Sequence, residues 1–482
     1  MPAPLVLGVD SSTQSVKVEL RRVDDGTVVA TGSAPHTATT PPVSEQDPEM
    51  WWEAFVQAVT SLGDHRKHVV AMAVAGQQHG LVLLDRDGRS LRPAKLWNDT
   101  TSAPQAERMV HALGAATWAE RTGSVPVASF TVTKLAWVAE HEPELLARAT
   151  MVMLPHDYLT WRLTGEYATD RGDASGTGWF DPVRNEYLAS HIELAIGDRH
   201  DITLPRIAGS FEPVGSLSEA AVELGLPIGI PVSPGPGDNM AAALGLGLRA
   251  GDVALSLGTS GTVFAVSGTP TIDPSGAVAG FASASGQYLP LVCTLNATKV
   301  TDTVARWLGA SVSEGADLAL AAARQPGRSM LIPYFDGERT PNLPDATGTL
   351  FGLTNETTRE QIALAAHDGV LCGLLSGRTA LERAGARVDG RLLLIGGGAR
   401  SRAFRQRCAD LRFDSLLVPS SDETVAAGAA VQAAICCEGS DVVEVADRWQ
   451  LGSGTEVEPM IDARGRVSDY HSHLSMLVDA SN

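Results

Sequence analysis

Asp10 is the first residue in the chain whose type and position suit phosphate chemistry. It ends a short apolar run over residues 5–9 and enters a turn of Ser and Thr residues. Phosphoryl transfer from a nucleotide requires Mg²⁺, which binds one or two carboxylates and keeps water and phosphate oxygens as its other ligands. We therefore predict that Asp10 organises a magnesium ion through water. The structural alternative, an aspartate that only stabilises the turn, stays open at this point.

Asp238 is the second such carboxylate. It follows a Pro-Gly-Pro-Gly stretch over residues 234–237, and the small residues of 239–248 predict a helix, so that Asp238 lies at a helix N-terminus. That position favours the charged form of the carboxylate. A charged carboxylate beside a cleft can accept the proton of a substrate hydroxyl. We predict that Asp238 is a catalytic base, against the alternative of an ordinary N-cap residue.

Two hydroxyl-rich turns lie about half a chain apart. If Asp10 is aligned with Ser256, Thr13 falls on Thr259, and each turn follows one strand and precedes another. Such turns can present several N–H groups to one anion. Either turn alone is also consistent with a simple hairpin turn. We predict that together they hold the phosphates of a nucleotide. The residues assigned to them are Ser12, Thr13, Gly258, Thr259 and Ser260, with Lys17 on the strand after the first turn.

A third candidate for nucleotide binding is a glycine loop. Residues 392–395 read as a buried strand that runs into Gly396-Gly397-Gly398-Ala399. Glycines there can serve only to let a helix pack closely on a strand. Together with the two turns, the loop predicts a site for the base and ribose of the nucleotide. The residues expected to bind them are Gly397, Gly398 and Ala399. Neither a GxxxxGK[ST] motif nor an HRD motif occurs, which excludes P-loop and protein-kinase machinery.

Polar and aromatic residues suited to a polyhydroxylated ligand follow the strand expected at 69–75. Gln78 and His79 end that strand, Trp97 and Asp99 lie in one short segment, and Asn239 follows the predicted base. One aromatic face with several hydrogen-bonding groups is typical of sugar binding. Taken singly, Trp97 could be a core residue, His79 a satisfied histidine and Asp99 a cap. Motifs of hydrolases, GxSxG and HExxH, are absent.

The elements that must position these residues alternate between strands and helices. Residues 5–9, 16–20 and 27–30 predict three strands joined by turns, and the pattern of 251–266 repeats the first two. A strand, helix and strand over 392–418 predict a βαβ unit. Residues 357–360 predict a capping box that opens a long helix. The sequence thus favours an α/β protein of two related domains, 1–243 and 244–482.

The composition is that of a globular protein of 482 residues with 44% hydrophobic and 19% charged residues. Its net charge of −19 argues against binding to nucleic acid or to an anionic membrane. No apolar run is long enough to cross a bilayer and only four residues precede the first strand, so we expect a cytoplasmic protein. The five cysteines form no CxxC pair and predict reduced, mostly buried thiols without a zinc site.

The motifs taken together resemble the FGGY family of carbohydrate kinases over nearly the whole chain. The most specific of them are Ser44-Glu45-Gln46-Asp47-Pro48-Glu49 with Trp51-Trp52, Gly76-Gln77-Gln78-His79-Gly80, Leu96-Trp97-Asn98-Asp99, Leu154-Pro155-His156-Asp157-Tyr158-Leu159, Gly237-Asp238-Asn239, Ser256-Leu257-Gly258-Thr259-Ser260-Gly261, Gly337-Glu338-Arg339-Thr340-Pro341 and Ile395-Gly396-Gly397-Gly398-Ala399-Arg400. Broad family signatures also occur around Lys134-Leu135-Ala136-Trp137 and over 348–368.

This resemblance implies two ribonuclease-H-like domains of the actin and hexokinase type, with an active-site cleft between them that binds ATP. The first domain would carry the sugar and the first phosphate turn, and the second would carry the other turn and the adenosine-binding loop. The resemblance also implies that Asp238 is the proton acceptor and that Gln78 and His79 touch the sugar.

We therefore expect an ATP- and Mg²⁺-dependent sugar kinase whose motifs are most similar to those of kinases for D-xylulose. Another pentulose, a polyol or glycerol remains an alternative acceptor. A nucleotide-driven clamp of the actin or chaperone type is the alternative from another class, but a base and a sugar-like group of side chains argue against it. The expected partners are small molecules only, and the sequence leaves the oligomeric state open, a homodimer included.

Overall fold

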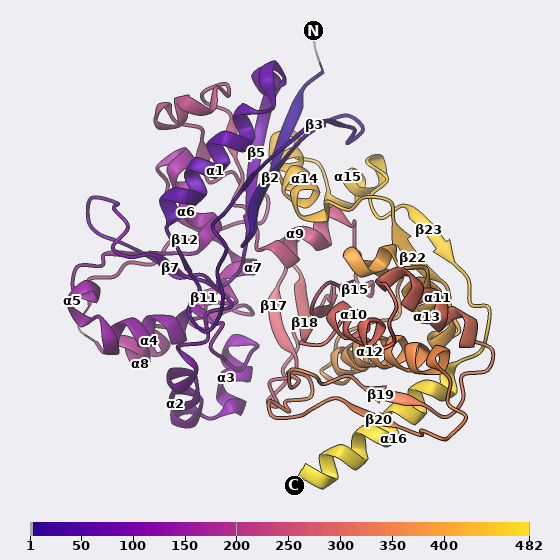
Figure 1. The fold of residues 1–482 in the computed structure, drawn as a ribbon. Helices are drawn as coiled ribbons and strands as arrows, with labels where there is room; N and C mark the ends of the chain where they lie inside the picture. The colour runs from indigo at the N-terminus through magenta and orange to yellow at the C-terminus, as the bar shows by residue number, and fades with distance from the viewer. Residues whose placement is uncertain (1–2, 199, 482) are drawn as a thin grey trace. The chain divides into compact units, whose positions relative to one another are not determined.

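The computed structural model describes residues 3–198 and 200–481, which form two compact units of mixed helices and strands (Figure 1). Unit 1 runs to Arg249 and also includes Ser267–Leu289 and Glu423–Gly452. Unit 2 comprises Ala250–Val266, Pro290–Asp422 and the residues from Ser453 onward. The α/β class expected from the sequence is confirmed. Unit 1 also takes in segments that follow residue 243 in the sequence.

Unit 1 is built on a sheet with the strand order β13-β14-β5-β1-β2-β3. Its strands are β1 (Leu5–Ser11), β2 (Ser15–Arg22), β3 (Val28–Pro35), β5 (Val69–Gly76), β13 (Gly215–Ser216) and β14 (Pro231–Val232). Its main helices are α1 (Pro48–Thr60), α2 (Ala103–Leu113), α3 (Ala115–Thr122), α4 (Thr131–His141), α6 (Pro155–Thr164), α7 (Arg171–Ala174), α8 (Ala189–Ile196), α9 (Asp238–Gly245), α14 (Thr424–Glu438) and α15 (Val442–Arg448).

Unit 2 contains a second sheet in which β18, β16, β15, β21, β22 and β23 are neighbours in this order. These strands are β15 (Val253–Leu257), β16 (Gly261–Ala265), β18 (Tyr288–Thr294), β21 (Leu392–Ile395), β22 (Leu416–Pro419) and β23 (Gly454–Val457). The helices of the unit are α10 (Thr298–Trp307), α11 (Val312–Ala322), α12 (Arg359–Arg383), α13 (Arg402–Arg412) and α16 (Arg464–Ser481).

The two sheets repeat one strand arrangement. In unit 1, β1 is antiparallel to β2 and parallel to β5, which in turn is parallel to β14. In unit 2, β15 is antiparallel to β16 and parallel to β21, which is parallel to β22. The repeated strand–turn–strand pattern in the sequence therefore corresponds to a repeated topology. It places the turns after β1 and after β15 at equivalent positions of the two sheets.

The strand β1 is buried along its whole length because helices cover both faces of the unit 1 sheet. Side chains alternate along a strand, so Leu7 and Val9 pack on the face that holds α1, and Val6 packs on the face that holds α14. Gly8 is required on the second face, since a Cβ there would lie 2.0 Å from the Ala426 carbonyl oxygen. Figure 1 shows α1 and α14 beside this sheet.

The helix α9 lies against the same small-residue surface of α14. A Cβ on Gly428 of α14 would lie 1.8 Å from the carbonyl oxygen of Ala241 in α9. Gly428 and its alanine neighbours therefore let two helices pack with their backbones in near contact. Because Asp238 is the first residue of α9, this contact fixes the position of the predicted base relative to β1.

Several local predictions agree with the structure to within a few residues. The long helix α12 opens with a capping box, but its N-cap is Thr358 and the partner is Gln361 rather than Glu360. All five cysteines are free; Cys372 and Cys408 are buried and Cys437 is exposed. Among the residues that the structure describes, no helix is both long and apolar enough to cross a membrane.

Candidate active site

Asp10 lies at the end of β1, opposite Lys17 of β2, and its side chain is almost fully buried. Burial, with a smaller contribution from the nearby Asp238, raises the pKa of Asp10 to about 7, although Lys17 acts in the opposite direction. Within residues 3–198 and 200–481, the Oδ1 atom has no hydrogen-bond partner. A buried carboxylate oxygen without a donor is costly, so it suits a cation or its bound water.

No group of three or more His, Cys, Asp or Glu side chains in the described residues could form a metal site by itself. This agrees with the chemistry of Mg²⁺ in phosphoryl-transfer sites, where one or two carboxylates are enough and the nucleotide supplies other ligands. The observation that fits a magnesium ion is the buried Oδ1 of Asp10, which has no donor among the described residues.

Asp238 is the first residue of α9, preceded by Gly237 as the N-cap. Its Oδ1 accepts hydrogen bonds from the backbone N–H of Asn239 at 2.7 Å and from the Asn239 side-chain amide at 2.8 Å. Burial raises the pKa of Asp238 to about 7, the amide of Asn239 lowers it, and Asp173 raises it. The side chain is partly exposed, and both of these hydrogen bonds engage Oδ1 and not the second carboxylate oxygen.

Asn239 joins the base to the residues predicted to bind sugar. Its side-chain amide donates to Gln78 Oε1 at 2.9 Å. The Gln78 Nε2 is buried without an acceptor in the part of the chain that the structure describes, and so is the Nε2 of Gln77. Gln77 was not assigned a role from the sequence. Buried amide donors of this kind, of which Gln78 is linked to Asp238 through Asn239, could be satisfied by a ligand with several hydroxyl groups.

His79 is held on two sides by its own unit. Its backbone has a φ of 64°, a left-handed conformation, and its carbonyl oxygen accepts a hydrogen bond from Thr131 at 3.2 Å. Its ring stacks on Phe130 with centroids 5.2 Å apart and planes 8° apart. Phe281 contacts the other part of the ring at 5.4 Å. The orientation of the imidazole is therefore fixed by packing.

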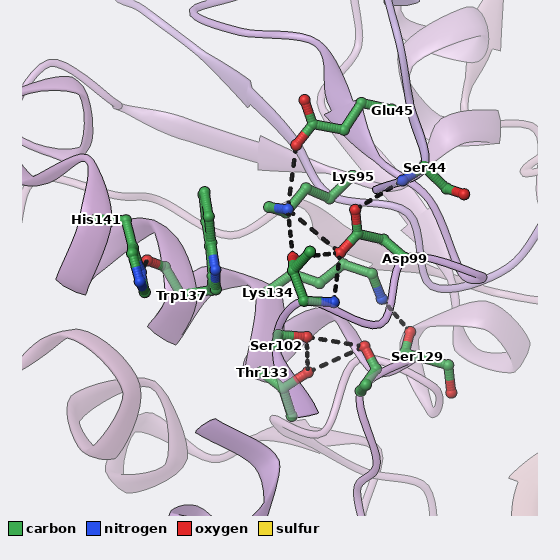
Figure 2. A network of polar contacts seen from close by, with 12 residues as sticks. Ser44, Glu45, Lys95, Asp99, Ser102, Ser129, Thr133, Lys134, Trp137 and His141 are labelled. Carbon is green, nitrogen blue, oxygen red and sulfur yellow. Dashed lines mark hydrogen bonds and ion pairs between the residues drawn. The ribbon is translucent and has the colours of Figure 1, made fainter. Parts of the chain in front are cut away.

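Trp97 and Asp99 have opposite surroundings although they are two residues apart. Trp97 is 44% exposed, and its indole N–H donates to the Thr13 hydroxyl at 2.9 Å. Asp99 is fully buried and accepts from Ser44 N at 2.9 Å, from Thr101 and from Lys95 Nζ at 3.3 Å (Figure 2). Burial pushes the pKa of Asp99 up, but the hydrogen bonds from Thr101 and Ser44 and the charge of Lys95 lower it overall.

This geometry gives the two residues different tasks. Trp97 is partly exposed and contacts the turn between β1 and β2 through its indole N–H. Asp99 anchors the turn that carries Trp97, because its carboxylate is already satisfied by donors from within the protein. A direct contact of Asp99 with the sugar stays a prediction from the sequence.

The first phosphate turn joins β1 to β2. Ser12 is used in the hairpin itself, since both its backbone N–H and its hydroxyl donate to the Ser15 carbonyl. The backbone N–H groups of Thr13 and Gln14 have no acceptor among the described residues. The Thr13 hydroxyl donates to Gln77 Oε1 at 3.1 Å. The turn thus offers two consecutive amides to an anion.

Lys17 lies on β2 just after that turn. Its Nζ donates to both carboxylate oxygens of Glu423, at 2.7 and 2.8 Å, and both side chains are about two-fifths exposed, at 42% and 40%. A partly exposed ion pair of this kind is weak and can exchange partners. Lys17 is therefore available for a phosphate oxygen if the pair with Glu423 opens.

In unit 2, the turn after β15 repeats these features. The Gly258 N–H is used within the turn, and Thr298 donates through both its N–H and its hydroxyl to the Gly258 carbonyl. The amides of Thr259 and Ser260 have no acceptor in the described part of the chain. A second pair of consecutive free amides thus occurs at the position equivalent to the first.

The glycine loop lies directly beside this second turn. A Cβ on Gly398 would lie 2.5 Å from the Leu257 side chain and 2.8 Å from Thr298, so only glycine permits this approach. Gly398 and Ala399 are buried, whereas Gly397 is exposed with open space above it. The structure therefore places the two segments of unit 2 that were predicted to bind nucleotide, the turn after β15 and the glycine loop, next to each other.

A buried charge cluster beneath the site was not predicted. His156 Nε2 lies 3.3 Å from Asp173 and 3.5 Å from Asp170, and its Nδ1 lies 3.5 Å from Asp157. Burial lowers the pKa of His156, but the three carboxylates outweigh this and raise it to about 9. Since the carboxylates come from α6, from the end of β9 (Ala168–Asp170) and from α7, no local sequence pattern predicts that they lie together.

Comparison with known proteins agrees with these features. Residues 5–245 match the N-terminal domain of the FGGY family of carbohydrate kinases, and residues 253–437 match its C-terminal domain. The chain is 48% identical to the xylulose kinase of Streptomyces rubiginosus, over 99% of this chain and 97% of that protein. It is 38% identical to the Escherichia coli xylulose kinase over 84% of each chain.

Solved structures show the same fold. The crystal structure of xylulose kinase from Bifidobacterium adolescentis is 38% identical, with a TM-score of 0.87 over 98% of this chain and 100% of that chain. Xylulose kinase from Rhodospirillum rubrum gives a TM-score of 0.90 at 27% identity, over 98% of each chain. Glycerol kinase from Plasmodium falciparum, at 19% identity and a TM-score of 0.87 over 98% of each chain, shares the fold.

Proposed function

Because the chain belongs to the FGGY family of carbohydrate kinases, we propose that it transfers the γ-phosphoryl group of ATP to the 5-hydroxyl of D-xylulose. It is a sugar kinase of the two-domain fold shared with actin and hexokinase, and its substrates are a sugar and ATP. The names of its relatives support D-xylulose as the acceptor. The proposed location is the cytoplasm, where ATP is available.

One observation carries this proposal most strongly, namely the arrangement around Asp238. Its carboxylate begins a helix, has one oxygen engaged by Asn239, and lies beside the amide of Gln78, whose Nε2 is buried and unused. In the proposed reaction, Asp238 accepts the proton of the sugar hydroxyl as the hydroxyl oxygen attacks the terminal phosphorus. Gln78, His79, Trp97 and Asn239 orient the sugar so that this hydroxyl faces the base.

The phosphates of ATP are assigned to the two turns, each through its pair of free amides. Lys17 supplies a positive charge near the first turn, and the loop at Gly397 supports the adenosine. Asp10 would hold Mg²⁺ through water. Bound there, the ion would neutralise charge that develops on the phosphate oxygens.

We predict that activity rises with pH through neutrality. Asp238 has to be ionised to act as a base, and its pKa is raised from its ordinary value to about 7. Below that pH the base is protonated, so kcat/KM is expected to fall about tenfold per pH unit. A profile of kcat/KM for the ketose from pH 5 to 9 measures this. A flat profile down to pH 5 would contradict the assignment.

We also predict the order of acceptors. D-xylulose is expected to give the highest kcat/KM in a panel that includes ribulose, other ketoses, polyols and glycerol. The panel is run with ATP and measured as ADP release. A clear preference for ribulose or glycerol would overturn the proposed acceptor but not the family. ATP hydrolysis that no sugar stimulates would instead favour the nucleotide-driven clamp.

A further inference from the structure

The helix α4 contains a lysine whose environment the catalytic roles above do not explain. Lys134 is fully buried, and its Nζ donates to the backbone carbonyl of Ser129 (Figure 2). Asp99 and Lys95 are the charged groups that act on it from the neighbouring turn. Burial of an ammonium group is costly, so packing alone would favour an apolar side chain at this position.

Lys134 donates a hydrogen bond to residues 127–130, a segment whose backbone carbonyl groups accept hydrogen bonds from side chains. The Thr133 hydroxyl lies within hydrogen-bond distance of the carbonyls of Phe130, at 2.9 Å, and Ala128, at 3.2 Å, which share its one proton. Ser102 donates to the Ala128 carbonyl at 3.0 Å. Together with the bond from Lys134, these contacts fix the backbone of residues 127–130, which precede α4 (Figure 2).

The held segment ends at Phe130, which supports His79. The two rings are nearly parallel and 5.2 Å apart, and the next residue, Thr131, donates to the His79 carbonyl. A left-handed, non-glycine residue such as His79 is strained and keeps its conformation only if its surroundings fix it. A shift of the 127–130 segment would therefore move the imidazole.

From this geometry we propose that Lys134 is a positioning residue that sets the pose of the acceptor sugar, by holding residues 127–130 and hence Phe130 against His79. It touches neither substrate. The inference rests on the proposed function for the identity of the sugar and for the contact of His79 with it.

The other end of α4 contacts a different segment of the chain. Trp137 lies under Lys95, with Nζ 3.9 Å from the ring centroid, and Lys95 pairs with Glu45 and Asp99. Those contacts support the turn of Trp97, which reaches the first phosphate turn. The contacts of Lys134 lead through Phe130 to His79 instead. Replacing Lys134 should therefore change the KM for the sugar more than the KM for ATP.

The test compares Lys134→Met, Phe130→Leu and the double variant with the unchanged chain. We expect Lys134→Met to lower kcat/KM for the ketose roughly tenfold to a hundredfold, mainly through KM, with KM for ATP changed less than about twofold. Phe130→Leu should act in the same way. The double variant should be no worse than about the stronger single variant, because both substitutions break one route.

Leu135→Ala is the matched control, since Leu135 is a buried residue of the same helix whose aliphatic side chain cannot hydrogen-bond to residues 127–130. Its loss of thermal stability is compared with that of Lys134→Met. Equal changes of ketose KM in these two variants, equal changes of both substrate KM values, or independent effects of Lys134→Met and Phe130→Leu would overturn the inference. Should Lys134→Met fail to fold, an unchanged ketose KM in Phe130→Leu would overturn it.

The proposed acceptor is checked first with the unchanged chain. If D-xylulose is not phosphorylated, that proposal fails, and the comparison of variants is made with the acceptor of the panel that is turned over.

Discussion

Replacement of Asp238 by asparagine is expected to lower kcat by about a hundredfold or more while the protein stays folded. Asparagine has nearly the same shape and can still accept the hydrogen bonds that Asn239 donates to Oδ1. What it loses is the ability to take the proton of the attacking hydroxyl. The expected loss therefore reports the chemical step and not the packing of α9.

Steady-state turnover at saturating ketose and ATP measures this effect, and circular dichroism with a melting curve shows that the variant is folded. Asp25→Asn is a suitable control, because Asp25 is an exposed carboxylate in a turn of the same unit. Retention of more than about a tenth of the turnover by folded Asp238→Asn would show that another group is the base.

The second large effect is expected on stability, at Asp368 in unit 2. This carboxylate is fully buried and accepts hydrogen bonds from Arg407 at 2.9 and 3.2 Å and from Arg466 at 2.9 Å. It thereby connects α12, α13 and α16. Asp368→Asn removes the carboxylate that Arg407 and Arg466 share and leaves Arg407 with Asp410, so one buried positive charge is no longer balanced, which should lower the free energy of unfolding by about 3–5 kcal/mol.

Urea denaturation followed by circular dichroism measures this loss. The control is Asp389→Asn, which breaks an exposed ion pair with Arg387 at 2.6 Å and should leave the midpoint unchanged. A shift of less than about 1 kcal/mol in Asp368→Asn would mean that asparagine and water satisfy both arginines.

Local signals account for what could be predicted from the sequence. The first two strands and their repeat could be predicted, because the alternation of apolar and polar residues and the turn residues are short-range features. These features also predict that Asp10 lies at a strand end. The stretch before Asp238 likewise marked a helix start. The end of that helix was placed at 248 instead of Gly245, since its small residues continue beyond the last helical turn.

Tertiary placement could not be predicted in the same way. Asp99 stands next to Trp97 and Asn98 in the sequence and resembles a ligand residue, yet the chain turns its carboxylate inward to Lys95 and Ser44. His156 meets Asp170 and Asp173 only because separate elements pack together. Residue types and spacing do not reveal which way a polar side chain points.

The glycine and alanine seam between α9 and α14 bears on attempts to alter the acceptor range. With helical backbones in near contact at Gly428, a random substitution there would push apart the scaffold that carries the base. Libraries for directed evolution would therefore gain little from this seam. Trp97 is a better position to vary, because its indole is 44% exposed and a different side chain there can extend into solvent.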